Sequence, residues 1–205
     1  TREITEFGFT PGLLMIKGRS YAGMQLWYDT VRGTNTVLRA DTSDFATSTH
    51  GDAHVGSRVN GIINDGFLYN HGSGSGSADI NSANHNYIAW GWKAGTPYTP
   101  TVSASEYTGA TASINVAGGF GIYKVTANTA AAGSSISHGL GAAPDMIIGK
   151  STANAYNWDV FFRGVTSATQ RLILNTDGGV ATASPYPTLA TSTNFYPGGD
   201  AHHGT

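Results

Sequence analysis

Two short stretches of sequence decide the fold: PGLLMIK at residues 11–17 and PDMIIGK at residues 144–150. Both place a proline and a lysine six positions apart around an apolar run, and the second stretch follows the first by 133 residues. The preceding residues match at the same offset, with FGFTPG at 7–12 and LGAAPD at 140–145. Separated matches at one offset indicate an internal repeat.

Further matches continue this repeat in the same order along the chain. WYDTVRG at 27–33 matches WDVFFRG at 158–164 at an offset of 131, which pairs Trp27 with Trp158. Leu38 pairs with Leu172 at an offset of 134, and Phe67 pairs with Phe195 at 128. Loops of different length between fixed strands produce such small changes of offset. The sequence therefore predicts two diverged copies of one unit.

Composition and patterning predict that both copies are built from β-strands. Only 12% of the residues are charged, while glycine occurs 28 times in 205 residues, which favours short strands and tight turns over surface helices. The segment 86–93 places Ile88, Trp90 and Trp92 on one strand face by period two. Strands are expected at 12–17, 25–31, 36–39, 61–64, 66–70, 86–93, 120–127, 146–150, 157–163 and 171–175. Many short strands between turn signals indicate an antiparallel sandwich or barrel.

The repeat divides the chain into a first copy at 1–95, a linker at 96–106 and a second copy at 107–205. The first copy has no evident counterpart before residue 7 and is expected to lack its opening strands. The second copy is expected to lack its closing strand. Two interpretations stay open: the chain is a fragment of a longer polypeptide, which we favour, or neighbouring chains donate the missing strands to exposed sheet edges.

Charge and composition argue against several classes of function. The net charge is -2 and the 11 basic residues are scattered, so no basic face for nucleic acid is expected. No apolar run of 18 residues and no signal peptide are evident, so we expect neither membrane insertion nor an export signal. The absence of cysteine fits assembly in a reducing cytoplasm.

The motifs resemble a repeated domain of unknown function found in tail-fibre-like and other virion structural proteins of marine and cyanobacterial phages. The first copy resembles it in FTPGLLMIKGRS, WYDTVRG, NDGFLYN and NYIAWGWKAG, and the second in HGLGAAPDMIIGKST and NWDVFFRG. The resemblance implies two tandem concanavalin-like or jelly-roll β-sandwich units. Gly149 departs from the family, whose strand more often has an apolar residue there. The family supplies no binding residues to carry over.

The resemblance also implies a function. It indicates a non-enzymatic virion protein, part of a tail fibre or surface fibre, assembled in the host cytoplasm and carried on the extracellular particle. Copies of itself, with strand exchange as one route, and other virion proteins are the expected partners. The alternative is a host-recognition adhesin module that binds a cell-surface glycan. No cofactor is expected.

Candidate site residues are few, and each has a plain structural interpretation. His50 and His54, like His202 and His203, are expected in solvated segments, so we predict no metal site. The glutamates are only Glu3, Glu6 and Glu106, and Asp29, Asp159 and Asp177 lie on or near strands without forming an evident catalytic pair, so we predict no catalytic residues. The segment HGSGSGSAD at 71–79 lacks the lysine and helix of a phosphate loop.

Aromatic residues are the remaining candidates for ligand binding, because rings with a polar edge suit half-wet sugar sites. The ligand-binding residues stay unknown at this stage. The tyrosines expected in or beside loops are Tyr21, Tyr69, Tyr156 and Tyr186. The tryptophans expected in the core are Trp27, Trp90, Trp92 and Trp158.

Overall fold

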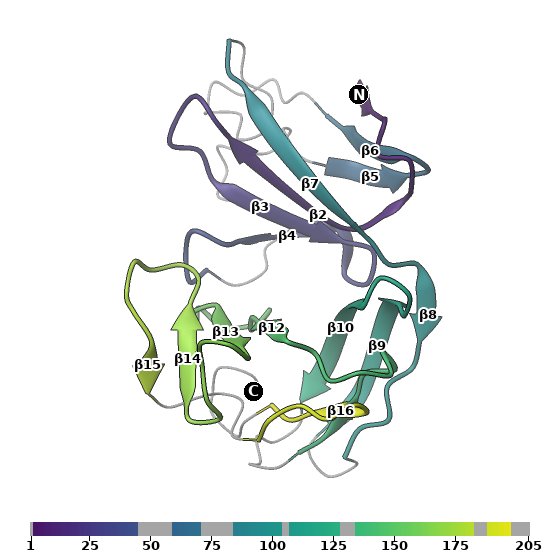
Figure 1. Ribbon diagram of the computed structural model, residues 1–205. Coiled ribbons are helices and arrows are strands. Elements are labelled where there is room, and N and C mark those ends of the chain that lie inside the picture. Colours follow the sequence, from purple (N-terminus) through teal and green to yellow (C-terminus); the bar gives the residue numbers. More distant parts are fainter. Residues whose placement is uncertain are drawn as a thin grey trace. The chain divides into compact units, whose positions relative to one another are not determined.

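The computed structural model describes residues 2–44, 59–70, 84–103, 107–127, 134–182 and 188–197. Within these ranges every element is a β-strand, all strand pairs are antiparallel, and no helix could cross a membrane. The chain divides into two compact units, which Figure 1 shows in the colours of the sequence. Residues 1–40 and 46–95 form the first unit, and residues 41–45 and 96–205 form the second.

The first unit contains two sheets that share one hydrophobic core. Strand order β1-β6-β5 makes one sheet and β4-β3-β2-β7 the other. The strands are β1 (Arg2–Ile4), β2 (Pro11–Gly18), β3 (Gln25–Asp29), β4 (Gly33–Arg39), β5 (Val59–Ile63), β6 (Gly66–Tyr69) and β7 (Tyr87–Lys93). Leu14, Ile16 and Tyr28 of the larger sheet pack in one cluster with Val59 and Phe67 of the smaller sheet. Each such side chain stabilises the fold by roughly 1.5–3 kcal/mol.

The second unit contains three sheets, with strand orders β10-β9-β8, β11-β16 and β12-β13-β14-β15. Its core brings together Tyr107, Ile136 and Phe195, with Tyr123 and Ile147 packed against them. The strands are β8 (Thr96–Tyr98), β9 (Tyr107–Asn115), β10 (Phe120–Ala127), β11 (Ile136–Ser137), β12 (Met146–Gly149), β13 (Asp159–Phe162), β14 (Gln170–Ile173), β15 (Ala181–Thr182) and β16 (Asn194–Phe195).

The hairpins β2–β3 and β12–β13 have the same register at a constant offset of 133 residues. Leu14 lies opposite Tyr28, and Ile147 lies opposite Phe161. Tyr28 and Phe161 are both 1% exposed, so the two hairpins bury an aromatic ring at the same place. Val160 therefore corresponds to Trp27, and the sequence match of Trp27 with Trp158 is displaced by two positions.

The backbone before each hairpin also corresponds at this offset. Glu6 and Gly8 have positive φ angles of 82° and 73°, and Gly139 and Gly141 have 68° and 79°. The next strands correspond at 134, because Leu38 lies opposite Trp27 and Leu172 opposite Val160.

Several elements differ from the sequence-based expectations. Residues 96–98, expected in the linker, form β8 and pair with β9, and residues 41–45, expected in the first copy, belong to the second unit. Residues 2–4 form β1, where Ile4 lies opposite Phe67 as Ile136 lies opposite Phe195. The first unit thus has a counterpart of β11 that the sequence comparison missed, because a strand of two or three residues has no periodicity to detect.

Candidate functional site

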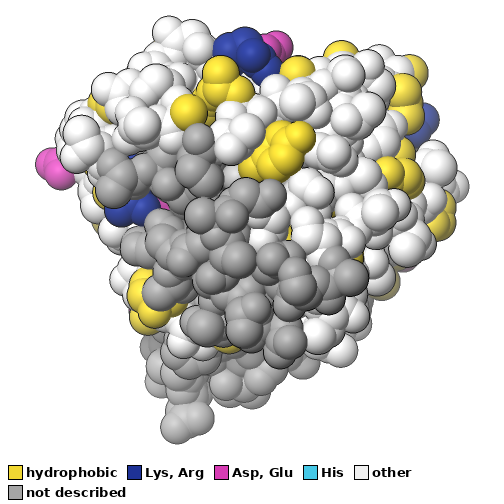
Figure 2. All heavy atoms as spheres, turned by 90° about the horizontal axis from the view of Figure 1, so that it is seen from below, with side chains coloured by type: hydrophobic (Ala, Val, Ile, Leu, Met, Phe, Trp, Pro, Cys, Tyr) yellow, Lys and Arg dark blue, Asp and Glu magenta, His cyan; other side chains and the backbone are white. Residues whose placement is uncertain are grey.

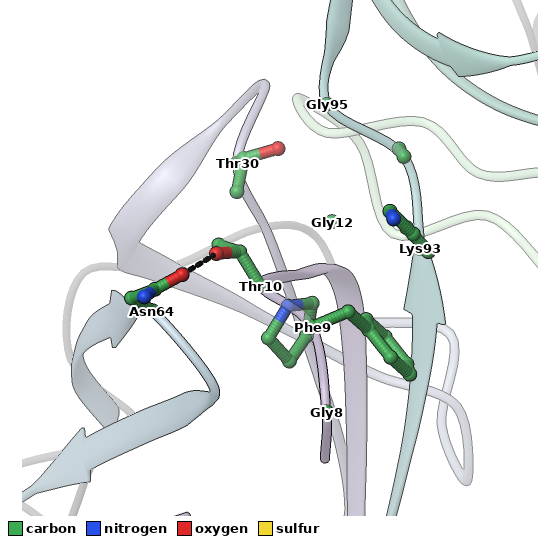
Figure 3. A pocket seen from close by; sticks show the side chains of 10 residues that line it. Gly8, Phe9, Thr10, Gly12, Thr30, Asn64, Lys93 and Gly95 are labelled. Atoms are coloured by element: carbon green, nitrogen blue, oxygen red, sulfur yellow. Dashed lines mark hydrogen bonds between the residues drawn. The ribbon is translucent and has the colours of Figure 1, made fainter.

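A half-open pocket of about 330 Å³ lies at one end of the first unit (Figure 3). Four separate segments line it: the lead-in to β2, the turn from β3 to β4, the turn from β5 to β6, and the end of β7. The lining residues are Gly8, Phe9, Thr10, Pro11, Gly12, Thr30, Asn64, Lys93, Ala94 and Gly95. Its volume falls near the lower end of the roughly 300–1,000 Å³ usual for small-molecule sites.

The lead-in segment is held in place by the turn between β5 and β6. The backbone N–H groups of Glu6 and Gly8 donate hydrogen bonds to the Asp65 carboxylate, and the Phe7 N–H donates to the Asp65 carbonyl oxygen at 3.3 Å. Glu6 and Asp65 adopt positive φ angles of 82° and 73°. Such angles cost non-glycine residues of order 1–3 kcal/mol and persist where surrounding bonds impose them. The pocket wall is therefore a fixed structure.

The floor of the pocket is made of small buried residues. Pro11, Gly12 and Ala94 are buried, and a Cβ atom at Gly12 would collide with Ala94. The Thr30 N–H donates to the Gly12 carbonyl oxygen at 2.9 Å, which ties the β3–β4 turn to the same floor. Only glycine at position 12 lets the end of β7 approach β2 this closely.

The rim carries exposed polar groups, namely the side chains of Thr10, Thr30, Asn64 and Lys93. The Thr10 hydroxyl donates to the Asn64 side-chain oxygen at 3.2 Å, which leaves the Asn64 NH₂ group as a donor (Figure 3). Phe9 adds a half-buried aromatic ring. The pocket thus combines hydroxyls, an amide, an ammonium group and a ring.

The corresponding place in the second unit carries an ion pair. At the offset of 133, Asp145 corresponds to Gly12 and Arg163 to Thr30, and the Arg163 N–H donates to the Asp145 carbonyl oxygen at 2.8 Å. The Arg163 Nε also donates to the Asp145 carboxylate at 2.8 Å. Two small side chains line the pocket of the first unit where two long charged ones are present in the second.

A second candidate surface is the outer face of the larger sheet in the first unit. Met15 lies opposite Trp27 on β3 and opposite Trp90 on β7, so the three side chains are neighbours across the sheet. Trp92 follows on the same face of β7. Trp90 is 38% exposed and Trp92 36% exposed. We call Met15, Trp27, Trp90 and Trp92 the aromatic face.

The expected core position of Trp90 and Trp92 was therefore wrong, although their shared face with Ile88 was right. The Phe7 ring explains the reversal, because a Cβ at Gly91 would lie 2.6 Å from it. With that space filled, β7 turns its small residues inward and its indoles outward. Trp27 is half-buried, and Trp158, at 3% exposure, is the tryptophan that meets the expectation most fully.

The acidic residues singled out in the sequence have structural partners. Asp29 is buried, accepts a hydrogen bond from the Arg32 Nε, and caps the β3–β4 turn by accepting from the Val31 N–H at 2.9 Å. Asp159 is fully buried and its Oδ1 lies 3.0 Å from Nη1 of Arg171. Asp177, Glu3 and Glu6 are exposed.

Lys150 forms a polar hub in the second unit. Its ammonium donates to the carbonyl oxygens of Ser43 at 3.1 Å, Ser151 at 3.1 Å and Asn154 at 3.2 Å. Burial lowers the pKa of Lys150 to about 8, and the nearby carboxylates of Asp44 and Asp159 offset part of that effect. The corresponding Lys17 likewise donates to a hairpin carbonyl, that of Gly23, at 3.3 Å. Both lysines therefore close hairpin loops.

His138 is a buried residue that the sequence reasoning did not single out. Its Nδ1 accepts from the Leu140 N–H at 3.1 Å, so its Nε2 carries the proton and donates to the Thr191 carbonyl oxygen at 3.1 Å. The Tyr123 hydroxyl donates to the His138 carbonyl oxygen, and burial raises the pKa of that phenol well above its usual range. Each bond ties one loop to another, which is a structural role.

Of the loop tyrosines, Tyr21 stacks with His85 at a ring distance of 4.5 Å and Tyr156 is half-buried. Tyr69 is a correction, because it lies on β6 and is 5% exposed in the core. The following lie outside the described residues: His50, His54, residues 71–79, Glu106, Tyr186, His202 and His203. Within the described ranges no group of three or more His, Cys, Asp or Glu could hold a metal ion.

Sequence reasoning missed the pocket, although each motif carried part of it. FTPG, WYDTVRG, NDG and WKAG each contribute lining residues. Most described side chains on the face drawn in Figure 2 are neither hydrophobic nor charged, and the coloured groups are small and separate. No curated protein and no solved structure matches the chain. One family model, the domain of unknown function DUF7483, matches residues 1–204 across both units, and the chain therefore belongs to that family.

Proposed function

We propose that this chain is a non-enzymatic structural protein of a bacteriophage virion, part of a tail fibre or surface fibre. In this proposal its two units are diverged copies of one concanavalin-like β-sandwich, assembled in the host cytoplasm with copies of itself and other virion proteins. The matching registers and positive φ angles of the two units support the repeat. The phage association rests on the resemblance of the motifs.

The observation that carries an assembly role is the aromatic face. Met15 and Trp27 are half-buried and Trp90 and Trp92 are at least 36% exposed, so large apolar side chains meet water side by side. Contiguous exposed apolar side chains mark contact surfaces in soluble proteins. Aromatic residues and methionine are also the types enriched at protein interfaces.

A different apolar pair is exposed in the second unit. Met146 and Phe162 lie opposite each other on β12 and β13 and are 55% and 41% exposed. Methionine sulfur and aromatic rings attract one another. We assign this pair of one copy as the occupant of the aromatic face of the next copy. A contact between two different surfaces of identical chains continues from copy to copy unless rotation closes it into a ring, which suits a fibre.

Sedimentation velocity over a range of protein concentrations tests this assembly. The chain is expected to self-associate, and the double substitution Trp90→Ser, Trp92→Ser is expected to reduce association by at least tenfold in concentration. Val116→Ser is the matched control, because Val116 is 56% exposed and lies outside both surfaces. A chain that stays monomeric at all concentrations, or a double variant that associates like the control, would contradict the proposal.

The alternative function is a glycan-binding adhesin module, and the pocket of the first unit is the observation that favours it. A screen of the whole chain on a glycan array separates the two roles, because a scaffold alone binds no glycan reproducibly. An assay for new reducing ends on host polysaccharide tests the non-enzymatic assignment in parallel.

A further inference from the structure

We propose that the pocket of the first unit binds a saccharide unit that carries a carboxylate, a uronic acid. This inference goes beyond the structural role and gives the glycan-binding alternative a site and a ligand class. It stands on the lining of the pocket, its fixed geometry and its charge.

The lining matches the alternating apolar and polar surface of a pyranose ring. Phe9 and Pro11 offer apolar surface for the C–H groups of a sugar. The Thr10 and Thr30 hydroxyls can both donate and accept, and the Asn64 NH₂ group donates (Figure 3). A few convergent polar groups around apolar surface are typical of sites for small ligands. The volume of about 330 Å³ limits the occupant to a single sugar unit.

The site is formed before any ligand arrives. Asp65 holds the backbone N–H groups of Glu6 and Gly8, Thr10 is bonded to Asn64, and Thr30 is tied to Gly12. Binding therefore orders little of the protein, which lowers the entropic cost of association. A fixed wall also lets shape discriminate between sugars.

Charge selects the class of sugar. Of the ten described residues that line the pocket, Lys93 is the only charged one. An ammonium on the rim favours a carboxylate over a neutral hydroxymethyl group by about 2- to 5-fold, the range of an exposed ion pair. For a ligand the size of a monosaccharide, a dissociation constant on the order of 1 mM is expected.

The pocket belongs to the first unit and not to the second. Asp145 and Arg163 occupy the positions of Gly12 and Thr30 there, and their ion pair brings a carboxylate to the equivalent place. That carboxylate would repel the acidic sugar. The second unit is therefore an internal control within the same molecule.

Titration of the ¹⁵N-labelled chain with glucuronic acid and with glucose tests the proposal. The two sugars differ at the carboxylate alone. Glucuronic acid is expected to shift the backbone amide signals of Thr10, Gly12, Thr30 and Gly95 saturably, and glucose to do so at about 2- to 5-fold higher concentration. Signals of Asp145 and Arg163 are expected to stay unchanged.

Substitutions separate charge from shape. Lys93→Gln is expected to abolish the preference for glucuronic acid while glucose binding persists, and Thr30→Val to weaken both sugars. Lys124→Gln is the matched control, because Lys124 is an exposed lysine of β10 in the second unit. The proposal is overturned if neither sugar gives saturable shifts in the pocket, or if the preference survives in Lys93→Gln. Self-association, measured separately, reports on the structural role alone.

Discussion

Asp159 and Arg171 form a buried ion pair between β13 and β14, and removing its carboxylate should destabilise the second unit. Asp159→Asn preserves the size of the side chain but removes the negative charge 3.0 Å from the guanidinium. Breaking a buried pair from one side costs about 3–5 kcal/mol. The lower end applies because the Arg171 side chain is 14% exposed. For a chain of 205 residues, ~3 kcal/mol corresponds to a fall in Tm of roughly 6–12 °C.

Hydrogen exchange read peptide by peptide, together with thermal unfolding, is the suitable assay. It assigns the loss to β12–β14 and distinguishes it from opening of the first unit. Asp145→Asn is the matched control, since it makes the same change in the pair with Arg163, whose side chains are 76% and 40% exposed. Exposed pairs contribute at most about 1 kcal/mol. Equal losses in the two variants would refute the reasoning.

Two further predictions concern the strands and the charge of Lys150. Gly66→Ala is expected to cost about 3 kcal/mol and to separate β1 from β6, because a Cβ at Gly66 would collide with the Ile4 carbonyl oxygen, whereas at Gly61 it meets only Leu68 at 3.7 Å. Chemical denaturation of Gly66→Ala and Gly61→Ala checks this, and similar midpoints would contradict it. Since the pKa of Lys150 is lowered from 10.5 to about 8, the unfolded chain binds the extra proton between these values, and stability relative to Lys150→Met should rise with pH across that window by on the order of 1 kcal/mol, after allowance for solvent screening. A flat difference between the two denaturation profiles over that range would exclude this coupling.

The strands that could be predicted from the sequence are those with large alternating side chains. All the expected strands are present, including β2, β3 and β7, with ends that differ by a few residues. The main element missed is β9, whose sequence YTGATASIN is rich in small residues. It lies between β8 and β10 and buries Ala112, Ser113 and Ile114 in succession, so its position in the sheet and not its composition makes it a strand.

The same limit explains the tryptophans and the aspartate on β13. Periodicity identifies a shared face but not which side of the sheet it meets, and Phe7, distant in sequence from β7, decides that side. Gly149 was noted only as a departure from the family. It lies opposite Asp159, so the missing side chain is on the same sheet face as the buried carboxylate. Tertiary packing makes one unusual residue the complement of another.

The pocket could not be predicted because none of its residues has unusual chemistry alone. Threonine, asparagine, glycine and one lysine are ordinary turn residues, and four turns must converge before they form a site. The comparison of the two units identifies which positions matter. Their backbones correspond through the positive φ angles, the hydrogen bond to residue 12 or 145, and the hairpin register. Since the scaffold is the same at this point, the exchange of Gly12 and Thr30 for Asp145 and Arg163 changes the chemistry offered to a ligand while the fold is retained.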